Sequence, residues 1–329
     1  MEIRIIGADD ARKALTMKEA ITGMKRAFSR LSAGRVEMPL RGSLPVTHQD
    51  GVLLTMPAAL PEDGELAVKL VTVFGKNPSR GFPLVHAVVI VLDINSGQIK
   101  ALIDGDFLTT IRTGAGVGAA TDLLARKNAS KLGVIGSSKL AQSLMEAVCT
   151  VRKIRYVRVF STNPEHAHKC AEEMSGKGPV PDDVQAVSSS QKAINKADIV
   201  CTATTSFTPV IAFENLKKGA HINAVGAFKP EMQEIDTATI LNALVVVDSF
   251  ESVLSEAGDL LIPINQGLIT KNHIHAEIGE LLNLKKNART SAGQTTLFKS
   301  CGVAVQDTVS ASIILKNAES KNLGTLVQI

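Results

Sequence analysis

The pattern of hydrophobic and polar positions changes character near residue 113. In the first part, apolar residues recur at helical spacing over residues 17–32, opened by the capping box Thr16-x-x-Glu19. Strand-like runs follow, separated by Gly, Pro and Asn, and they cover residues 51–56, 65–74, 85–93 and 99–104. This part is therefore predicted to form a mostly antiparallel sheet with a helix or two.

From Gly114 onward, short apolar runs alternate with helical patterns. Helices are predicted over residues 115–124 and 140–151. The predicted strands span residues 132–135, 156–160, 184–187, 198–202, 221–225 and 244–248. This alternation predicts an α/β fold in which a doubly wound parallel (Rossmann) sheet accompanies the mixed α+β first part. A last helical stretch over residues 295–318 is expected to pack back on the first part.

Composition narrows the classes of function. With 329 residues, 45% hydrophobic and 21% charged, the chain is typical of a globular protein of two domains. Its apolar runs are far shorter than the roughly 20 residues of a membrane span, and no signal-peptide pattern follows Met1. A net charge of +4 without Lys/Arg runs, one Tyr and no Trp give no nucleic-acid footprint. We therefore expect neither a membrane nor a nucleic-acid partner.

The cysteines and histidines indicate neither disulfides nor a metal site. The four cysteines are scattered without a C-x-x-C pair, and the seven histidines show no ligand spacing. These features favour free thiols in a reducing cytoplasm, so a cytoplasmic location without a bound metal is expected.

Residues 131–141 resemble a dinucleotide-binding fingerprint without its middle glycine. The usual G-x-G-x-x-G/A is here Gly136-x-Ser138-x-x-Ala141, between a short apolar strand and a helix. A Cβ at Ser138 is expected to crowd the pyrophosphate, although the serine keeps its N–H and Lys139 adds a charge. The sequence thus predicts a weakened dinucleotide site; the alternative is a doubly wound domain that has lost its nucleotide.

The second predicted strand of this domain bears on the choice between NAD and NADP. An acidic residue at its end would bind the ribose 2′-OH of NAD, but the chain continues Phe160-Ser161-Thr162-Asn163. NADP is therefore permitted, yet no Arg follows that would hold its 2′-phosphate.

Three basic residues are candidates for substrate chemistry. Lys69 occupies a strand that is apolar on both faces, so its ammonium must be paired or have a depressed pKa, unless the strand lies at an edge and the side chain reaches water. Arg112, where the two patterns meet, can bind a carboxylate or form a structural ion pair between domains. Arg41 has no local context that distinguishes it from a surface arginine.

Several segments together are similar to one protein family. They occur in that family's order, cover nearly the whole chain, and comprise residues 67–73, 93–97, 101–105, 111–113, 223–236, 256–260 and 296–307. On these segments the chain resembles the ornithine cyclodeaminase/μ-crystallin family. The resemblance implies a homodimeric enzyme whose residues 1–113 and 300–329 bind substrate and dimerise. Residues 114–299 would form a Rossmann domain that holds NADPH or NADH, with the substrate in the cleft between the domains.

The resemblance also implies roles for individual residues. Lys69 matches the catalytic position, and the substrate would contact Arg41, Lys69, Arg112, Phe228 and Cys301. Together with the fingerprint, it assigns cofactor contacts to Arg112, Thr113, Gly136, Ser137, Ser138, Lys139, Leu140, Ser161, Thr162, Asn163, Thr202, Val225, Gly226 and Ser300.

Two departures from the family pattern affect the expected substrate. Phe228 stands where cyclodeaminases and related alanine dehydrogenases have an aspartate for the substrate's amino group, and Leu84 replaces a hydroxyl-bearing residue. A free amine would lose its anionic partner here, whereas a flat cyclic imine would not. The predicted function is NAD(P)H-dependent reduction of a small anionic cyclic imino acid, 1-pyrroline-2-carboxylate or 1-piperideine-2-carboxylate, to L-proline or L-pipecolate. The alternatives are an ornithine cyclodeaminase or alanine dehydrogenase, and a non-catalytic crystallin-like binding protein.

Overall fold

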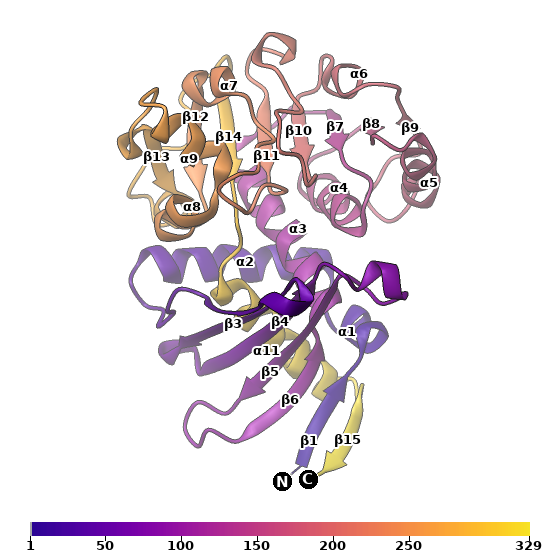
Figure 1. The fold of residues 1–329 in the computed structure, drawn as a ribbon, viewed down its shortest axis with the longest axis vertical. Helices are drawn as coiled ribbons and strands as arrows, with labels where there is room; N and C mark the ends of the chain where they lie inside the picture. The colour runs from indigo at the N-terminus through magenta and orange to yellow at the C-terminus, as the bar shows by residue number, and fades with distance from the viewer. Residues whose placement is uncertain (1) are drawn as a thin grey trace. The chain divides into compact units, whose positions relative to one another are not determined.

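A computed structural model describes residues 2–329 and divides the chain into two compact units. Unit 1 combines the residues up to Arg112 with Val303–Ile329, and unit 2 is the intervening segment Thr113–Gly302. Each unit has its own sheet (Figure 1).

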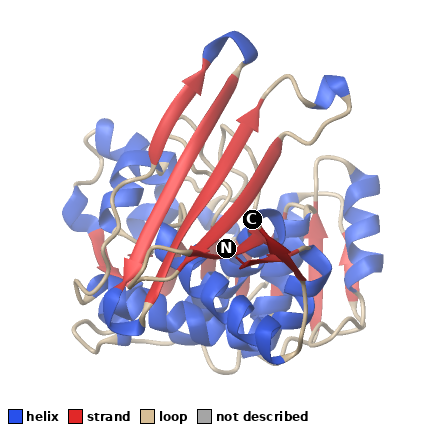
Figure 2. Cartoon of the chain, turned by 90° about the horizontal axis from the view of Figure 1, so that it is seen from below, coloured by secondary structure: helices blue, strands red, loops and turns tan. Residues whose placement is uncertain are grey.

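Unit 1 contains a seven-stranded sheet in the order β15-β1-β6-β5-β4-β3-β2. All its neighbouring strands are antiparallel except β1 and β6, so the mostly antiparallel sheet predicted for this part is confirmed. In Figure 2 its long strands run side by side. The strands are β1 (Glu2–Ile6), β2 (Gly42–Val46), β3 (Gly51–Leu60), β4 (Glu65–Phe74), β5 (Val85–Leu92), β6 (Ile99–Asp104) and β15 (Thr325–Gln328).

Three helices, α1 (Ala8–Ala14), α2 (Met17–Ser32) and α11 (Ala304–Ser320), accompany this sheet. The predicted capping box at Thr16 and Glu19 is formed at the start of α2. Helix α11 packs against α2 and against β3 and β4. A Cβ added at Gly23 of α2 would come within 2.7 Å of Ile313 in α11, so the small residue lets these two helices approach closely. The end of the chain thus completes the core of its beginning.

Unit 2 contains an eight-stranded parallel sheet in the order β13-β12-β14-β11-β10-β7-β8-β9. The strand order reverses beside β7, which confirms the predicted doubly wound topology. Alternate residues of β7 and β10 belong to two different hydrophobic clusters, so both faces of the sheet are covered. The strands are β7 (Lys131–Ile135), β8 (Tyr156–Phe160), β9 (Val184–Ala186), β10 (Ile199–Thr202), β11 (His221–Ala224), β12 (Ala243–Val247), β13 (Ile274–Glu277) and β14 (Thr295–Lys299).

Seven helices of the described chain follow or connect these strands, and those after β10 are all short. The seven are α4 (Lys139–Val151), α5 (Pro164–Met174), α6 (Ser190–Ile194), α7 (Thr237–Asn242), α8 (Phe250–Glu256), α9 (Gly258–Asn265) and α10 (Ile278–Leu282). Helix α3 (Gly105–Leu124) runs through the boundary between the two units.

Two predicted helices have different bounds in the structure. The stretch 295–318 is not one helix, because residues 295–299 form β14, paired between β11 and β12 with all five residues buried. Its β-branched and aromatic side chains suit a strand that is covered on both faces. Helix α3 begins at Gly105 rather than at residue 115, because the Asp104 carboxylate accepts a hydrogen bond from the N–H of Phe107 (2.8 Å) and caps it.

Within residues 2–329, the structure has no helix that is both long and apolar enough to cross a membrane.

Candidate active site

The fingerprint of unit 2 forms the turn from β7 into α4. Gly136 has a φ of +117°, and a Cβ there would lie 2.5 Å from the Ala203 carbonyl oxygen, so only glycine fits. Ser138 has an ordinary φ of −71° and is the N-cap of α4; its Oγ accepts a hydrogen bond from the N–H of Ala141 (3.5 Å). The serine thus replaces the middle glycine without backbone strain. Ser137 beside it is half-buried and Lys139 is exposed, while Leu140 packs against the hydrophobic core.

Thr202 is the last residue of β10, and Val225 directly follows the neighbouring strand β11. Val225, just after β11, donates its N–H to the Thr202 carbonyl (3.2 Å). Thr202 is fully buried, and its Oγ1 has no hydrogen-bond partner among the described residues. A buried hydroxyl without a partner at the carboxyl end of a parallel strand is suited to a ligand. Thr113, in the middle of α3, is half-buried.

The segment after β8 contains the other predicted cofactor residues. Ser161 is half-buried and Thr162 is exposed. Asn163 is the N-cap of α5, and its Oδ1 accepts from the N–H groups of Glu165 (2.9 Å) and His166 (3.4 Å). Its side chain therefore already has a structural role.

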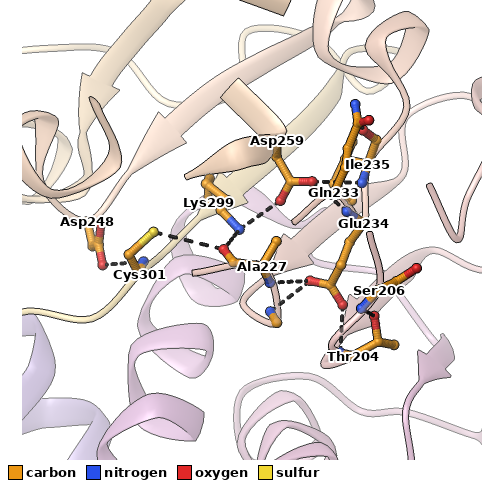
Figure 3. Close-up of polar contacts among 11 residues, drawn as sticks. Thr204, Ser206, Ala227, Gln233, Glu234, Ile235, Asp248, Asp259, Lys299 and Cys301 are labelled. Carbon is orange, nitrogen blue, oxygen red and sulfur yellow. Dashed lines mark hydrogen bonds and ion pairs between the residues drawn. The ribbon is translucent and has the colours of Figure 1, made fainter. Parts of the chain in front are cut away.

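A buried carboxylate, Glu234, holds two loops that follow β10 and β11 (Figure 3). It accepts hydrogen bonds from the backbone N–H groups of Thr204 (2.6 Å), Gly226 (2.7 Å) and Ala227 (3.1 Å). Burial raises the pKa of Glu234, and the hydrogen bond from Thr204 acts against that rise. A Cβ at Gly226 would overlap the Thr204 backbone, so this position also requires glycine.

A second buried pair continues this network. The Asp259 carboxylate accepts from the N–H groups of Glu234 (2.7 Å) and Ile235 (2.9 Å) and from Lys299 Nζ (2.7 Å). Lys299 also donates to the Ala227 carbonyl. Burial opposes the charge on Lys299, but the attractions of Asp259, Cys301 and Glu234 together outweigh it and hold the pKa of this ammonium above its usual value.

Asp248, just after β12, fixes the segment that follows β14. Its Oδ2 accepts from Ser300 Oγ (2.6 Å) and from the N–H groups of Cys301 (3.0 Å) and Gly302 (2.7 Å). Cys301 Sγ lies 4.0 Å from the carbonyl oxygen of Ala227, the residue before Phe228. The structure therefore brings together the β11 and β14 loops that carry the predicted site residues Gly226, Phe228, Ser300 and Cys301. Phe228 is 43% exposed.

Unit 1 contains a separate buried cluster of charges around Asp307. Lys69 Nζ lies 2.7 Å from Asp307 Oδ2, and Arg112 Nε donates to Asp307 Oδ1 (3.0 Å). Arg112 Nη1 donates to Gln306 Oε1 (3.1 Å), and Lys69 also donates to Thr109 Oγ1 (3.4 Å). Lys69 and Asp307 are 2% and 1% exposed, so these charges are shielded from water.

The surroundings of Lys69 show whether it is a buried lysine or an edge lysine that reaches water. Strand β4 lies between β3 and β5, so Lys69 is not an edge lysine that reaches water. Burial lowers the pKa of Lys69 to about 8, against the attraction of Asp307; Arg112 and Arg41 lower it as well. Arg41 directly precedes β2, is half-buried, and is close enough to act electrostatically on Lys69. The ion pair of Arg112 lies within unit 1 rather than between domains.

Five of the buried ionisable residues in the networks described above were not among the predicted site residues. Asp307 was missed because its partner Lys69 lies on a distant strand, although an acid in a helix of small and apolar residues was an available signal. Lys299 lies in β14, Asp248 directly follows β12, Glu234 lies in a loop and Asp259 in α9. The partners of these four residues are mostly backbone groups that no sequence pattern identifies.

No group of three His, Cys, Asp or Glu side chains within residues 2–329 could hold a metal ion. None of the four cysteines, Cys149, Cys170, Cys201 and Cys301, forms a disulfide.

The doubly wound sheet of unit 2, with its glycine turn after β7 at the carboxyl ends of the strands, defines a protein of the dinucleotide-binding α/β class. A model of the ornithine cyclodeaminase/mu-crystallin family matches residues 3–322, and the chain belongs to that family. It is 38% identical over 325 residues to a Delta(1)-pyrroline-2-carboxylate reductase of Bacillus cereus, covering 98% of this chain and 99% of the relative.

Solved structures agree with this assignment. The Delta(1)-pyrroline-2-carboxylate reductase of Thermococcus litoralis, in complex with NADH and L-proline, matches with a TM-score of 0.94 and 38% identity over 98% of this chain and 99% of that one. An archaeal alanine dehydrogenase dimer with bound NAD matches with a TM-score of 0.93 and 32% identity over 100% of both chains.

Proposed function

We propose that this protein is an oxidoreductase that reduces the C=N bond of a cyclic imino acid with NADH or NADPH, converting 1-pyrroline-2-carboxylate to L-proline. The ring-expanded pair, 1-piperideine-2-carboxylate and L-pipecolate, is the other candidate substrate and product. The observation that carries the proposal is the buried Lys69–Asp307–Arg112 cluster. Full-length similarity to a reductase of this name supports it.

The two arginines are proposed to bind the substrate carboxylate. Asp307 and Gln306 hold the Nε and Nη1 atoms of Arg112, which orients its guanidinium before substrate arrives. A guanidinium oriented in this way can bind a carboxylate through parallel hydrogen bonds. Arg41 adds a second positive charge near Lys69.

Lys69 is proposed as the catalytic residue that supplies or retains the proton on the imine nitrogen. With a pKa of about 8, its ammonium is mostly protonated at neutral pH yet loses a proton more readily than an ordinary lysine. A protonated C=N is the better hydride acceptor, so holding that proton lowers the barrier to reduction. Asp307 keeps the ammonium in place.

The residues at the carboxyl ends of the unit 2 strands are suited to bind a nicotinamide dinucleotide. The N-terminus of α4 offers backbone N–H groups to a pyrophosphate, and the hydroxyl of Thr202 has no partner within residues 2–329. When bound, the nicotinamide supplies the hydride. The Glu234 and Asp248 networks would fix the loops that face it, which carry the predicted contacts Gly226 and Ser300.

Unit 1 is proposed to bind substrate and to form a homodimer, and unit 2 to bind the dinucleotide. The dimeric archaeal alanine dehydrogenase that matches the whole chain supports the dimer. A cytoplasmic location is proposed with it, supported by four cysteines that form no disulfide.

Reduced-nicotinamide oxidation with three substrates tests the proposed reaction. We expect oxidation with 1-pyrroline-2-carboxylate and none with ornithine or with pyruvate plus ammonia, because Phe228 offers no anionic partner to a free amine. Turnover of pyruvate and ammonia instead would identify an alanine dehydrogenase. Nucleotide binding without turnover of any substrate would contradict the proposal and indicate a binding protein.

A further inference from the structure

A pocket of about 720 Å³ opens in unit 2 where β8 and β9 end. These two strands are paired in parallel, and Val187 continues the pairing by donating its N–H to the Val159 carbonyl (2.9 Å). Residues of helices α5 and α6 line the pocket as well. Phe160, Pro164 and Val187 contribute an apolar lining that suits a flat aromatic base.

The place of the pocket in the fold connects it with the dinucleotide. β8 is the second strand of the doubly wound sheet, next to β7 and its phosphate-binding turn. In this topology the residues after the second strand meet the adenosine ribose and decide between a 2′-OH and a 2′-phosphate.

The polar groups of the pocket favour a phosphate. The lining contains the hydroxyls of Ser161 and Thr162, the imidazole of His168 and the ammonium of Lys192, and it contains no carboxylate. A carboxylate here would bind the 2′-OH of NAD and repel a 2′-phosphate.

Lys192 reaches the pocket from a different part of the chain. It lies on α6, after β9, and its Nζ donates to the Oγ of Ser188 (2.9 Å), which also lines the pocket. This contact ties the ammonium to another residue of the lining. It supplies the positive charge that the segment after β8 lacks, since no arginine follows Asn163 there.

We propose that this pocket takes the adenosine 2′-phosphate of NADPH and that Lys192 is the residue that makes the protein prefer NADPH to NADH. The proposal rests on the dinucleotide-binding part of the function proposed above.

Calorimetric titration of the full-length protein with 2′,5′-ADP and with 5′-AMP tests the pocket without turnover. We expect 2′,5′-ADP to bind at least about tenfold more tightly, because a charge-assisted hydrogen bond contributes at least that factor. Lys192→Ala should remove most of this difference and leave 5′-AMP binding unchanged. Lys169→Ala is the matched control, since Lys169 lies on α5, is exposed, and does not line the pocket.

Equal binding of the two nucleotides by the wild-type protein would overturn the inference, and so would an equal loss of both in Lys192→Ala. Turnover of 1-pyrroline-2-carboxylate separates this inference from the proposed reaction. The same kcat/KM with NADH and NADPH would overturn the proposed cofactor preference but not the proposed reductase activity. Selective binding of 2′,5′-ADP without turnover would support the pocket and reject the reductase activity.

Discussion

Lys69 illustrates what a single residue reveals in a sequence and what it does not. Its place in an apolar strand predicts a paired or perturbed ammonium, and the structure has both, with Asp307 as its partner and a pKa of about 8. The identity of the partner could not be predicted, because Asp307 lies on the last long helix and no local spacing links the two residues. A buried charge is recognisable from its neighbours in sequence, whereas its counter-ion depends on the tertiary fold.

Replacing the proposed catalytic lysine tests its role directly. Lys69→Met should lower kcat with 1-pyrroline-2-carboxylate by at least about a hundredfold, the scale of one proton-transfer group. Lys100→Met, at an exposed lysine of β6 in the same sheet, should leave kcat unchanged. Thermal unfolding of both variants shows whether they are folded. Near-normal turnover in folded Lys69→Met would reject the mechanism.

The pH profile of the reaction should show the same lysine. Activity requires its protonated form, so kcat/KM should be present below pH 8 and fall as pH rises through about 8. For stability the sign is different: the pKa is depressed from 10.5 in the folded state, so the cost of burying the ammonium is present below about pH 8 and is relieved as pH rises toward 10.5. A profile that stays flat to pH 10 would contradict the assignment.

Ser138 caps a helix and is also a residue of the proposed nucleotide site. Because its Oγ caps α4, Ser138→Ala should lower the free energy of unfolding by about 1 kcal/mol, and Ser138→Gly by only a few tenths. Removing the Cβ is expected to tighten dinucleotide binding by up to about tenfold. Urea unfolding and fluorescence titration measure the two effects. If Ser138→Gly binds dinucleotide no better than the wild-type protein, the Cβ of Ser138 does not weaken the site.

Among the elements, the loops after the parallel strands depend on buried carboxylates. Glu234 is the central one, since three backbone N–H groups from two loops converge on it. An amide at this position would direct its own N–H₂ toward these donors. Glu234→Gln should therefore lower the free energy of unfolding by about 2 kcal/mol, and urea denaturation would measure it. Glu214→Gln, at an exposed position of unit 2, is the control; equal, small losses in both variants would contradict this role.

Helices and strands could be predicted where the apolar pattern extends over many residues, and less well where it covers only a few. The capping box and the apolar spacing placed α2 correctly at Met17–Ser32, and the strand that carries Lys69 was predicted with its observed bounds, Glu65–Phe74. By contrast, residues 295–299 are a strand that was predicted as helix, because a short apolar run does not reveal whether both of its faces are covered. Helix α3 was predicted too short, since its cap is the side chain of Asp104 at the end of β6.

For the whole molecule, thiol reactivity offers a test of how the chain is packed. Burial raises the pKa of Cys149 and Cys201 to about 12 and that of Cys170 to about 11, whereas Cys301 is only half-buried. Near neutral pH the native protein should therefore expose one rapidly reacting thiol, and the denatured protein all four of its cysteines. Titration with an aromatic disulfide counts them. Rapid reaction of two or more thiols in the native state would contradict this packing.

The division of the chain has a consequence for its synthesis. Unit 2 is one continuous segment, so all its strands leave the ribosome before α11 does, whereas unit 1 needs segments from both sides of unit 2. Until α11 emerges, Lys69 and Arg112 have no Asp307 with which to pair, and the faces of β3 and β4 that α11 covers remain open to water. During synthesis, the segment proposed to bind the dinucleotide is thus complete first, and the charges proposed to bind substrate are neutralised only after α11 has been translated.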